Sequence, residues 1–389
     1  MDASQIISLL PEEVLTDLAI ETKVNRYAKK LQAEILFKLL MHCILSHKEN
    51  SLRTMESAYE SMAFQLLNKG KKKNSIRFSS ISERLSVMNA DYFEKIYQSC
   101  IRIYGKVMKE EAASFIRYDS TIVALSTQLL KEGYLIKGGD AEHVRLLKFT
   151  IGFSQLPQSA HFYTEQQYGS ENIALKESIL AHQPIKTNAI RIFDRGLNAR
   201  KTFDEFIEKK IPFISRVMAS NKHEVYLQNQ LLKPVKTDSL KITSDEWVYL
   251  FSENKKKTRH PIRYIKCKQL TTKEEIVFVT NISDLTAAQV TDLYKRRWDI
   301  EVFFKFLKQE LNFSHLINRS ENGIRIMLYA TLIASILLLV YKKLNGLAGY
   351  KIMKLKFVQE LEKSITRDIV IMTGGDPVIF DNLFSKPPD

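Results

Sequence analysis

The sequence predicts an α/β fold: a mixed sheet with flanking helices, interrupted by an antiparallel β insertion and preceded by an all-helical N-terminal region. Three patterns indicate this. Apolar residues recur at helical spacing through residues 1–107. From Phe115 the apolar period changes to two, which is typical of strands. Residues 218–282 then contain alternating runs separated by short polar turns, which favours hairpins.

The N-terminal region contains a lysine-rich loop at 68–75. Beyond it we expect Ser79 and Ser80 to cap a short helix, Asn89 to end that helix, and a longer helix to begin near Asp91. Two helices joined by a tight polar turn beside a basic loop could dock on DNA. Helix pairs are also common in proteins that bind no DNA, so this pattern alone leaves both interpretations open.

The strand region places two acidic residues in one α/β unit. Asp119 lies in the middle of a strand, on its more polar face, and Asp194 lies at the carboxyl end of another. An aspartate in such a position is costly unless it is paired or binds a cation. The expected strands are 115–125, 146–154, 160–167, 188–196 and 211–217, and the expected helices between them are 170–182 and 199–209.

The charge of the chain favours a polyanionic partner. Its 389 residues include 58 Lys and Arg against 44 Asp and Glu, a net charge of +14 and a pI near 9.4. Nucleic acid is the first candidate and an anionic membrane the second, while charge that serves only solubility is the alternative. Cys43, Cys100 and Cys267 form no CxxC or Cys/His pattern, which argues against a disulfide framework and a zinc site.

One segment requires a membrane test. Residues 326–341 contain no charge, but sixteen residues are fewer than a bilayer span needs, and basic residues flank the run on both sides. We interpret it as a helix buried in a large core and expect no membrane partner. The N-terminus has no basic segment followed by an apolar one, so we expect no signal peptide and a cytoplasmic, nucleoid-associated location.

The segment from Tyr294 to Leu311 is predicted to be one amphipathic helix. At about 100° per residue, Tyr294, Arg297, Glu301 and Lys308 fall on one side, next to an apolar stripe. A salt-bridged helix wall is the simplest interpretation. Combined with Asp119 and Asp194, however, Glu301 completes a set of three carboxylates that can hold two Mg²⁺ ions for phosphodiester chemistry.

The spacing Tyr294-x2-Arg297-x3-Glu301-x6-Lys308 resembles the signature of DDE transposases of bacterial insertion sequences, in the group called insertion-sequence family four. Trp298 matches the group's frequent Arg-Trp pair, and we expect it to contact DNA. Asp119 in RYDST and Asp194 in FDRG stand where the family's two catalytic aspartates stand. One departure concerns the residues after Asp194, where Gly196 is kept but the aromatic that often follows is replaced. The resemblance covers residues from about 75 to 345.

The resemblance implies an RNase H-like core in which Asp119, Asp194 and Glu301 bind two Mg²⁺ ions, with Mn²⁺ as a substitute. It also implies binding to the terminal inverted repeats of the element and to target DNA, a homodimer that joins two DNA ends, strand cleavage and strand transfer. The resemblance also implies that Tyr294, Arg297 and Lys308 hold the phosphate near the 5′ end of the strand that is not transferred. It further implies that an aromatic residue of the insertion receives a flipped base. Trp247 is the first candidate for that role, and Tyr249 and Phe251 are the alternatives.

Two other residues near the signature have simpler interpretations. Lys305 lies on the same side of the expected helix but outside the signature, where it adds positive charge. His315 lies just beyond the helix, where it could approach the site, but a loop histidine with a local hydrogen bond is the simpler interpretation. Together these patterns divide the chain into a helical DNA-binding region (1–107), a first part of the core (108–217), the β insertion (218–282), a second part of the core (283–345) and a C-terminal helical tail (346–389).

The sequence and the resemblance together predict an endonuclease and strand transferase that moves its own insertion sequence. The resemblance further implies a cut-and-paste reaction through a hairpin intermediate. Two alternatives remain open. One is a transposase-derived protein that binds DNA without cleaving it, against which the presence of all three acids argues. The other is a stand-alone nuclease with the same core, which would not need the residues that handle a hairpin.

Overall fold

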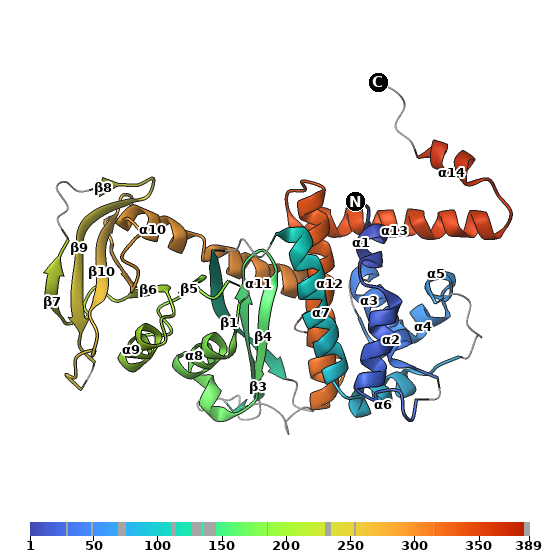
Figure 1. Cartoon of the computed structure of the whole chain (residues 1–389). Helices are drawn as coiled ribbons and strands as arrows, with labels where there is room; N and C mark the ends of the chain where they lie inside the picture. Colours follow the sequence, from blue (N-terminus) through green and yellow to red (C-terminus); the bar gives the residue numbers. More distant parts are fainter. Residues whose placement is uncertain are drawn as a thin grey trace. The chain divides into compact units, whose positions relative to one another are not determined.

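The chain divides into two compact units (Figure 1), one formed by Met1–Met108 with Lys305–Asp389 and the other by Lys109–Phe304. They are seen in a computed structural model that describes residues 1–384 except 29, 48–49, 69–74, 110–113, 126–133, 136–144, 185, 230–234, 253 and 314. We call them the helical unit and the sheet unit. The lysine-rich loop predicted at 68–75 falls almost entirely outside the described residues.

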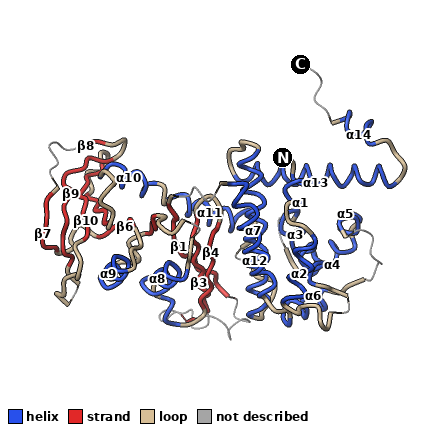
Figure 2. The backbone as a smooth tube through the Cα atoms, in the orientation of Figure 1, coloured by secondary structure: helices blue, strands red, loops and turns tan. Residues whose placement is uncertain are grey.

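The helical unit contains only helices in its described part (Figure 2). Its longest helix is α12 (Glu321–Leu344), which packs against helices from both ends of the chain. The others are α1 (Ala3–Ser8), α2 (Glu12–Glu21), α3 (Ala33–Ser46), α4 (Leu52–Glu60), α5 (Met62–Leu67), α6 (Phe78–Val87), α7 (Asp91–Met108), α13 (Tyr350–Met372), α14 (Pro377–Leu383) and the last turns of α11 (Trp298–Glu310).

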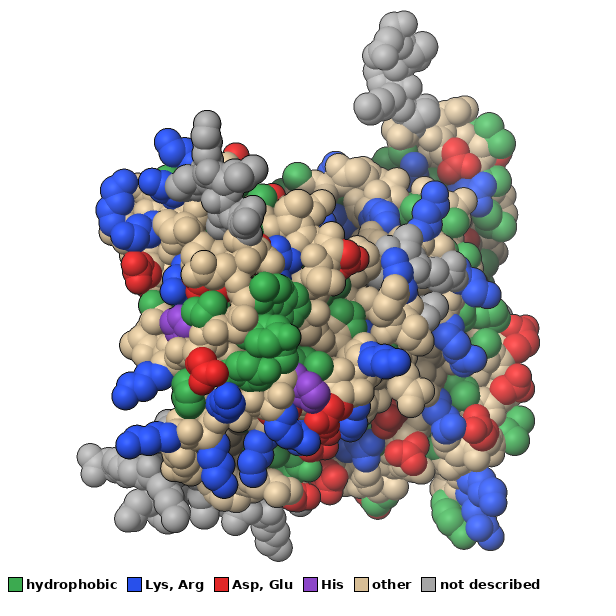
Figure 3. All heavy atoms as spheres, turned by 60° about the vertical axis from the view of Figure 1, so that its left-hand side comes forward, with side chains coloured by type: hydrophobic (Ala, Val, Ile, Leu, Met, Phe, Trp, Pro, Cys, Tyr) green, Lys and Arg blue, Asp and Glu red, His purple; other side chains and the backbone are tan. Residues whose placement is uncertain are grey.

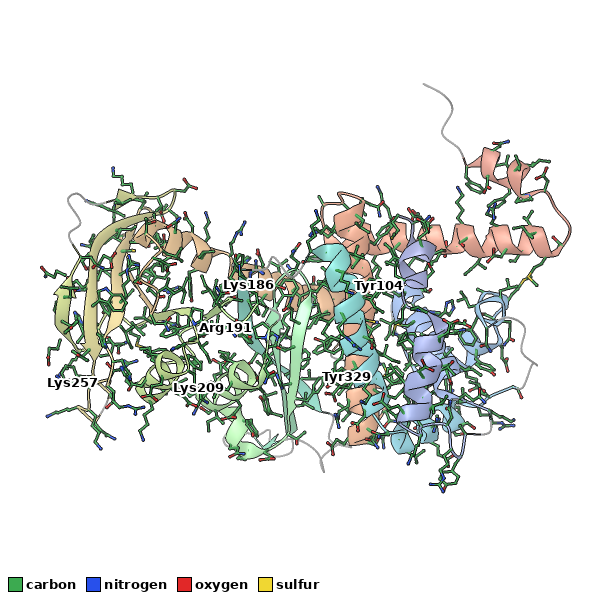
Figure 4. All side chains as sticks on the ribbon, in the orientation of Figure 1. Tyr104, Lys186, Arg191, Lys209, Lys257 and Tyr329 are labelled. Carbon is green, nitrogen blue, oxygen red and sulfur yellow. The ribbon has the colours of Figure 1, made fainter. Side chains whose placement is uncertain are left out.

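Helix α12 is the centre of the helical unit. Among the described residues it is the one helix long and apolar enough to cross a membrane, but 94% of its most apolar window is buried inside the protein. The ring of Tyr329 lies 5.6 Å from that of Tyr97 on α7, and the Tyr104 hydroxyl on α7 donates to the Ile6 carbonyl at 2.8 Å (Figure 4). The interpretation of residues 326–341 as a buried core helix is confirmed.

The start of α6 differs from the prediction. The helix begins at Phe78, so Ser79 and Ser80 lie inside its first turn rather than at a cap. The capping acceptor comes from another helix, because the Glu56 carboxylate on α4 accepts the Phe78 N–H at 3.0 Å. The following helix begins at Asp91 as predicted.

The sheet unit is built on one mixed sheet in the order β2-β3-β1-β5-β6-β11-β10-β9-β7, with β4 paired to β3 and β8 to β9. Strands β1, β5 and β6 are parallel, and the pairs from β6 through β11, β10 and β9 to β7 are antiparallel. The strands are β1 (Phe115–Leu125), β2 (Tyr134–Leu135), β3 (Arg145–Phe153), β4 (Pro157–Tyr163), β5 (Ile190–Phe193), β6 (Phe213–Val217), β7 (His223–Gln228), β8 (Val235–Lys236), β9 (Leu240–Leu250), β10 (Ile262–Gln269) and β11 (Glu275–Thr280).

Helices cover the sheet: α8 (Glu171–Ala181) and α9 (Arg200–Glu208) contribute to one apolar core, and α10 (Ala287–Lys295) contributes to another. In the first core the Phe203 ring of α9 stacks on Phe213 of β6, with centroids 5.3 Å apart. In the second, the Tyr294 ring of α10 meets Phe278 of β11 edge-on at 5.2 Å. This architecture is the predicted α/β fold with an antiparallel β extension, and it is consistent with an RNase H-like core.

A buried ion pair joins β9 and β10 in the antiparallel part of the sheet. Arg263 of β10 donates two hydrogen bonds to the Asp245 carboxylate of β9, at 2.9 and 2.6 Å, and both side chains are only 6% exposed. The remaining guanidinium nitrogen donates to the Ile282 and Leu285 carbonyls, in the connection to α10. The pair is therefore fully hydrogen-bonded and links the two strands to the segment that leads into the site.

Removing one partner of this pair should destabilise the sheet unit strongly. Arg263→Ala leaves the Asp245 carboxylate buried without its cation, which typically costs about 3–5 kcal/mol. The change is measured by urea unfolding or by the protection of β9 and β10 amides against hydrogen exchange. The matched control is Glu275→Ala, which breaks the exposed Lys268–Glu275 pair on the neighbouring strands and should change stability by less than about 1 kcal/mol. Equal effects of the two substitutions would contradict this assignment.

Candidate active site

The parallel strands bring the two predicted aspartates side by side. Tyr118 of β1 pairs with Phe193 of β5, so Asp119 and Asp194 follow at the same level of neighbouring strands. Glu301 lies in the first turn of α11. The Arg297 guanidinium contacts the Glu301 carboxylate and lies 3.9 Å from the Asp119 carboxylate. All three acids thus lie in one neighbourhood of the sheet unit.

Asp119 is in an unfavourable position for a negative charge. Burial raises its pKa from 3.8 to about 6, against the effects of the Ser120 N–H, which donates to it at 2.8 Å, and of Arg297. The nearby carboxylates of Asp194 and Glu171 raise the pKa further. A cation beside these side chains would relieve both the burial cost and the repulsion.

The turn after β5 shows why Gly196 follows Asp194. The Gly196 N–H donates to the Asp194 carboxylate at 2.5 Å. A Cβ on Gly196 would lie 1.7 Å from the Glu171 carboxylate and 3.0 Å from that of Asp194, so any larger residue would displace them. The glycine therefore leaves room for two acidic side chains to approach one another.

Two further side chains near the acids, those of Glu171 and Lys148, are not among the residues predicted from the sequence. Glu171 is the first residue of α8, and its carboxylate lies 3.9 Å from the ammonium of Lys148 on β3. Lys148 is 3% exposed and donates to the Gly169 carbonyl at 3.1 Å, and burial lowers its pKa. The signal in the sequence was weak: one lysine in an apolar strand and one glutamate that opens a helix.

The predicted single helix from Tyr294 to Leu311 is wrong. Tyr294 lies on α10, Glu301 and Lys308 lie on α11, and Arg297 lies in the junction between the helices. In the junction the Ile300 N–H donates to the Arg297 carbonyl, three residues back, rather than to Arg296. Lys308 and Lys305 lie in the part of α11 that belongs to the helical unit.

Arg117 explains the break between the two helices. Its Nε donates at 2.6 Å to the Arg296 carbonyl, the group that a continuous helix would offer to Ile300. Its other nitrogens donate to the Ser154 carbonyl after β3, at 2.6 Å, and to the Asp299 carboxylate, at 2.7 Å. Arg117 is 6% exposed, so this buried cation ties the start of α11 to the strand that carries Asp119.

The predicted aromatic contacts lie in different settings. Trp298 opens α11 and is 62% exposed, so its ring is available to a partner. Trp247 and Tyr249 are half-buried on β9. The Lys257 ammonium lies over the Tyr249 ring, 4.8 Å from the ring centroid. Phe251 forms an isolated bridge with Lys257 just beyond β9. His315 belongs to the helical unit, where its backbone N–H bonds Asn312.

The donor set suits a hard divalent cation, since Asp119, Asp194 and Glu301 offer only carboxylate oxygens. As the described side chains lie, no three His, Cys, Asp or Glu residues are arranged to hold a metal ion. At the same place the Arg297 guanidinium contacts the Glu301 carboxylate and lies 3.9 Å from that of Asp119. The residue types of the three acids fit such an ion.

The raised pKa of Asp119 predicts how stability depends on pH. The folded state binds this proton more tightly than the unfolded state, so its contribution is favourable below pH 4 and is lost as the pH rises through about 6. Asp119→Asn should therefore raise the thermal midpoint relative to wild type at pH 8 but not at pH 4, in buffer with a chelator. The corresponding gain in the free energy of unfolding at pH 8 should be up to about 3 kcal/mol. The same shift at both pH values would contradict the assignment.

Comparisons with known proteins place the chain in a family. The family described as "Transposase DDE domain" matches residues 113–337, which is more than half of the chain.

The chain is 29% identical over 161 residues to a protein named as a transposase in Sinorhizobium fredii, a match that covers 41% of this chain and 45% of that protein. It is 30% identical over 156 residues to a protein of Geobacillus stearothermophilus named as the transposase of insertion sequence element IS5377, covering 39% of this chain and 40% of the relative. The chain thus matches less than half the length of these relatives, and on the family match it belongs to the DDE transposase domain family.

Proposed function

We propose that this protein is a magnesium-dependent DNA endonuclease and strand transferase that moves its own insertion sequence. One observation carries the proposal. Asp119 and Asp194 lie at the same level of two parallel strands, and Arg297 forms ion pairs with both Asp119 and Glu301. The net charge of +14 supports DNA as the substrate, and Lys and Arg side chains are spread over the face seen in Figure 3.

In the proposed reaction the three carboxylates hold two Mg²⁺ ions, with Mn²⁺ as a substitute. Bound there, the ions would activate water or a 3′-hydroxyl and stabilise the leaving oxygen of a phosphodiester. The protein's part is to fix the ligands. Asp194 is held by the Gly196 N–H, Asp119 by the Ser120 N–H, and Glu301 by the helix that Arg117 anchors.

Tyr294, Arg297 and Lys308 are proposed to hold the phosphate near the 5′ end of the strand that is not transferred. Burial raises the pKa of Tyr294 to about 12, so its phenol stays neutral and can donate to a phosphate oxygen. Trp298 presents an exposed ring for stacking on a base or sugar, and Trp247 is the proposed receiver of a flipped base in a hairpin intermediate.

The proposed partners are the element's terminal inverted repeats, target DNA and a second copy of this chain in the synaptic complex. We propose that residues 1–107 bind DNA, that 108–217 and 283–345 form the two parts of the catalytic core around the insertion 218–282, and that 346–389 is a C-terminal tail. The proposed site of action is the bacterial cytoplasm, at the nucleoid.

The decisive experiment incubates the protein and Mg²⁺ with labelled duplex that carries the element's ends. Wild type should cut at the element boundary, and Glu301→Gln should slow cleavage by roughly a thousandfold or more, because it removes a metal-binding charge but keeps the size of the side chain. The control is Glu310→Gln at the end of the same helix, which should cut at the wild-type rate.

Two other outcomes would contradict the proposal, each in a different way. Specific binding of the ends without cleavage in Mg²⁺ or Mn²⁺ would indicate a DNA-binding protein that has lost catalysis. Nicking of arbitrary duplex with no preference for the ends would indicate a stand-alone nuclease.

A further inference from the structure

Arg297 occupies the centre of the candidate site. One terminal nitrogen of its guanidinium contacts the Glu301 carboxylate, and the other lies 3.9 Å from that of Asp119. The side chain is 15% exposed and passes near the Tyr294 ring, 5.9 Å from its centroid. Its position in the helix junction makes it a bridge between a carboxylate on the sheet and a carboxylate on α11.

The hydrogen bonds of this guanidinium are incomplete. Its Nε is buried and has no hydrogen-bond acceptor among the described residues. A buried donor without an acceptor is unfavourable, and arginine pairs best with an anion that offers two adjacent oxygens for parallel hydrogen bonds, as a carboxylate or a phosphate does. The two carboxylates engage the terminal nitrogens and leave the buried Nε–H unpaired, so another group's oxygen can reach it only if the guanidinium moves.

We propose that Arg297 is a latch that couples DNA phosphate to metal binding, an inference that rests on the proposed function. In the protein without DNA, its positive charge takes the place of a cation between Asp119 and Glu301. A DNA phosphate supplies the acceptor that Nε lacks and draws the guanidinium away. Both carboxylates are then released to bind divalent ions.

The coupling follows from competition for the same oxygens. While Arg297 is engaged, a divalent cation must displace a bound positive charge, so the affinity of the free protein for metal is reduced. A phosphate that holds Arg297 elsewhere removes that competition. By thermodynamic linkage, the factor by which the phosphate raises metal affinity equals the factor by which metal raises affinity for the phosphate. The catalytic ions are thus recruited when DNA is in place.

The test measures Mn²⁺ binding to the full-length protein without DNA, by titration calorimetry or by the electron paramagnetic resonance signal of free Mn²⁺. Arg297→Gln removes the charge and keeps a polar side chain, and it should bind Mn²⁺ about tenfold more tightly than wild type, the effect expected of one partly buried charge-assisted contact. Arg296→Gln is the matched control: it removes the same charge from the adjacent exposed residue and should change the affinity less than twofold.

A second arm adds a short duplex of arbitrary sequence with or without a 5′-phosphate. The phosphorylated duplex should tighten Mn²⁺ binding to wild type and to Arg296→Gln, but not to Arg297→Gln. Equal Mn²⁺ affinities for the two variants, or weaker binding by Arg297→Gln, would overturn the latch while the metal site stands. If Asp194→Asn removes no Mn²⁺ site from any of these proteins, the metal site of the proposed function fails and the latch fails with it.

Discussion

The site depends on one buried cation, Arg117. Its guanidinium donates to the backbone where β3 ends, to the backbone between α10 and α11, and to the Asp299 carboxylate at the start of α11. The Phe115 and Phe153 rings lie 4.8 and 5.7 Å from it and shield it from water. Because Asp119 is two residues away on the same strand and Glu301 two residues after Asp299, this one side chain fixes the distance between two of the three acids.

The same arrangement opposes stability. Asp119 is buried in a strand, Asp194 and Glu171 approach each other over a glycine, and Lys148 is buried beside them. Like charges held together in a poorly solvated place persist where the rest of the fold over-determines them. Here the parallel strands, the stacked Phe153 and Phe303 rings at 4.5 Å and the Arg117 bonds provide that constraint. A site with this excess of negative charge is suited to capture cations.

Much of the fold could be predicted from local patterns. The strand from Phe115 to Leu125 is predictable because its apolar residues alternate. Helix α10 begins at a capping box formed by Thr286 and Gln289, whose spacing is also a local signal. The helix break at Arg297 could not be predicted, since its cause is a tertiary hydrogen bond from Arg117, 179 residues earlier in the chain.

The candidate site, like the fold, could be predicted only in part. Residue type and spacing selected Asp119, Asp194 and Glu301, and the structure brings these three into one neighbourhood. Spacing alone also placed Tyr294 and Glu301 on one helix, which the structure does not support. Glu171 and Lys148 enter the site through long side chains from elements that meet only in the folded sheet. A periodic pattern describes which face a residue occupies, but it cannot say which distant side chains that face will meet.

If Asp119, Asp194 and Glu301 share one cation-binding site, it should be visible by anomalous diffraction from crystals of the protein bound to DNA and soaked in Mn²⁺. We expect anomalous peaks within about 2.0–2.5 Å of carboxylate oxygens of all three residues, with Arg297 turned toward a phosphate. Peaks elsewhere, or a peak that leaves Glu301 still paired with Arg297, would contradict it.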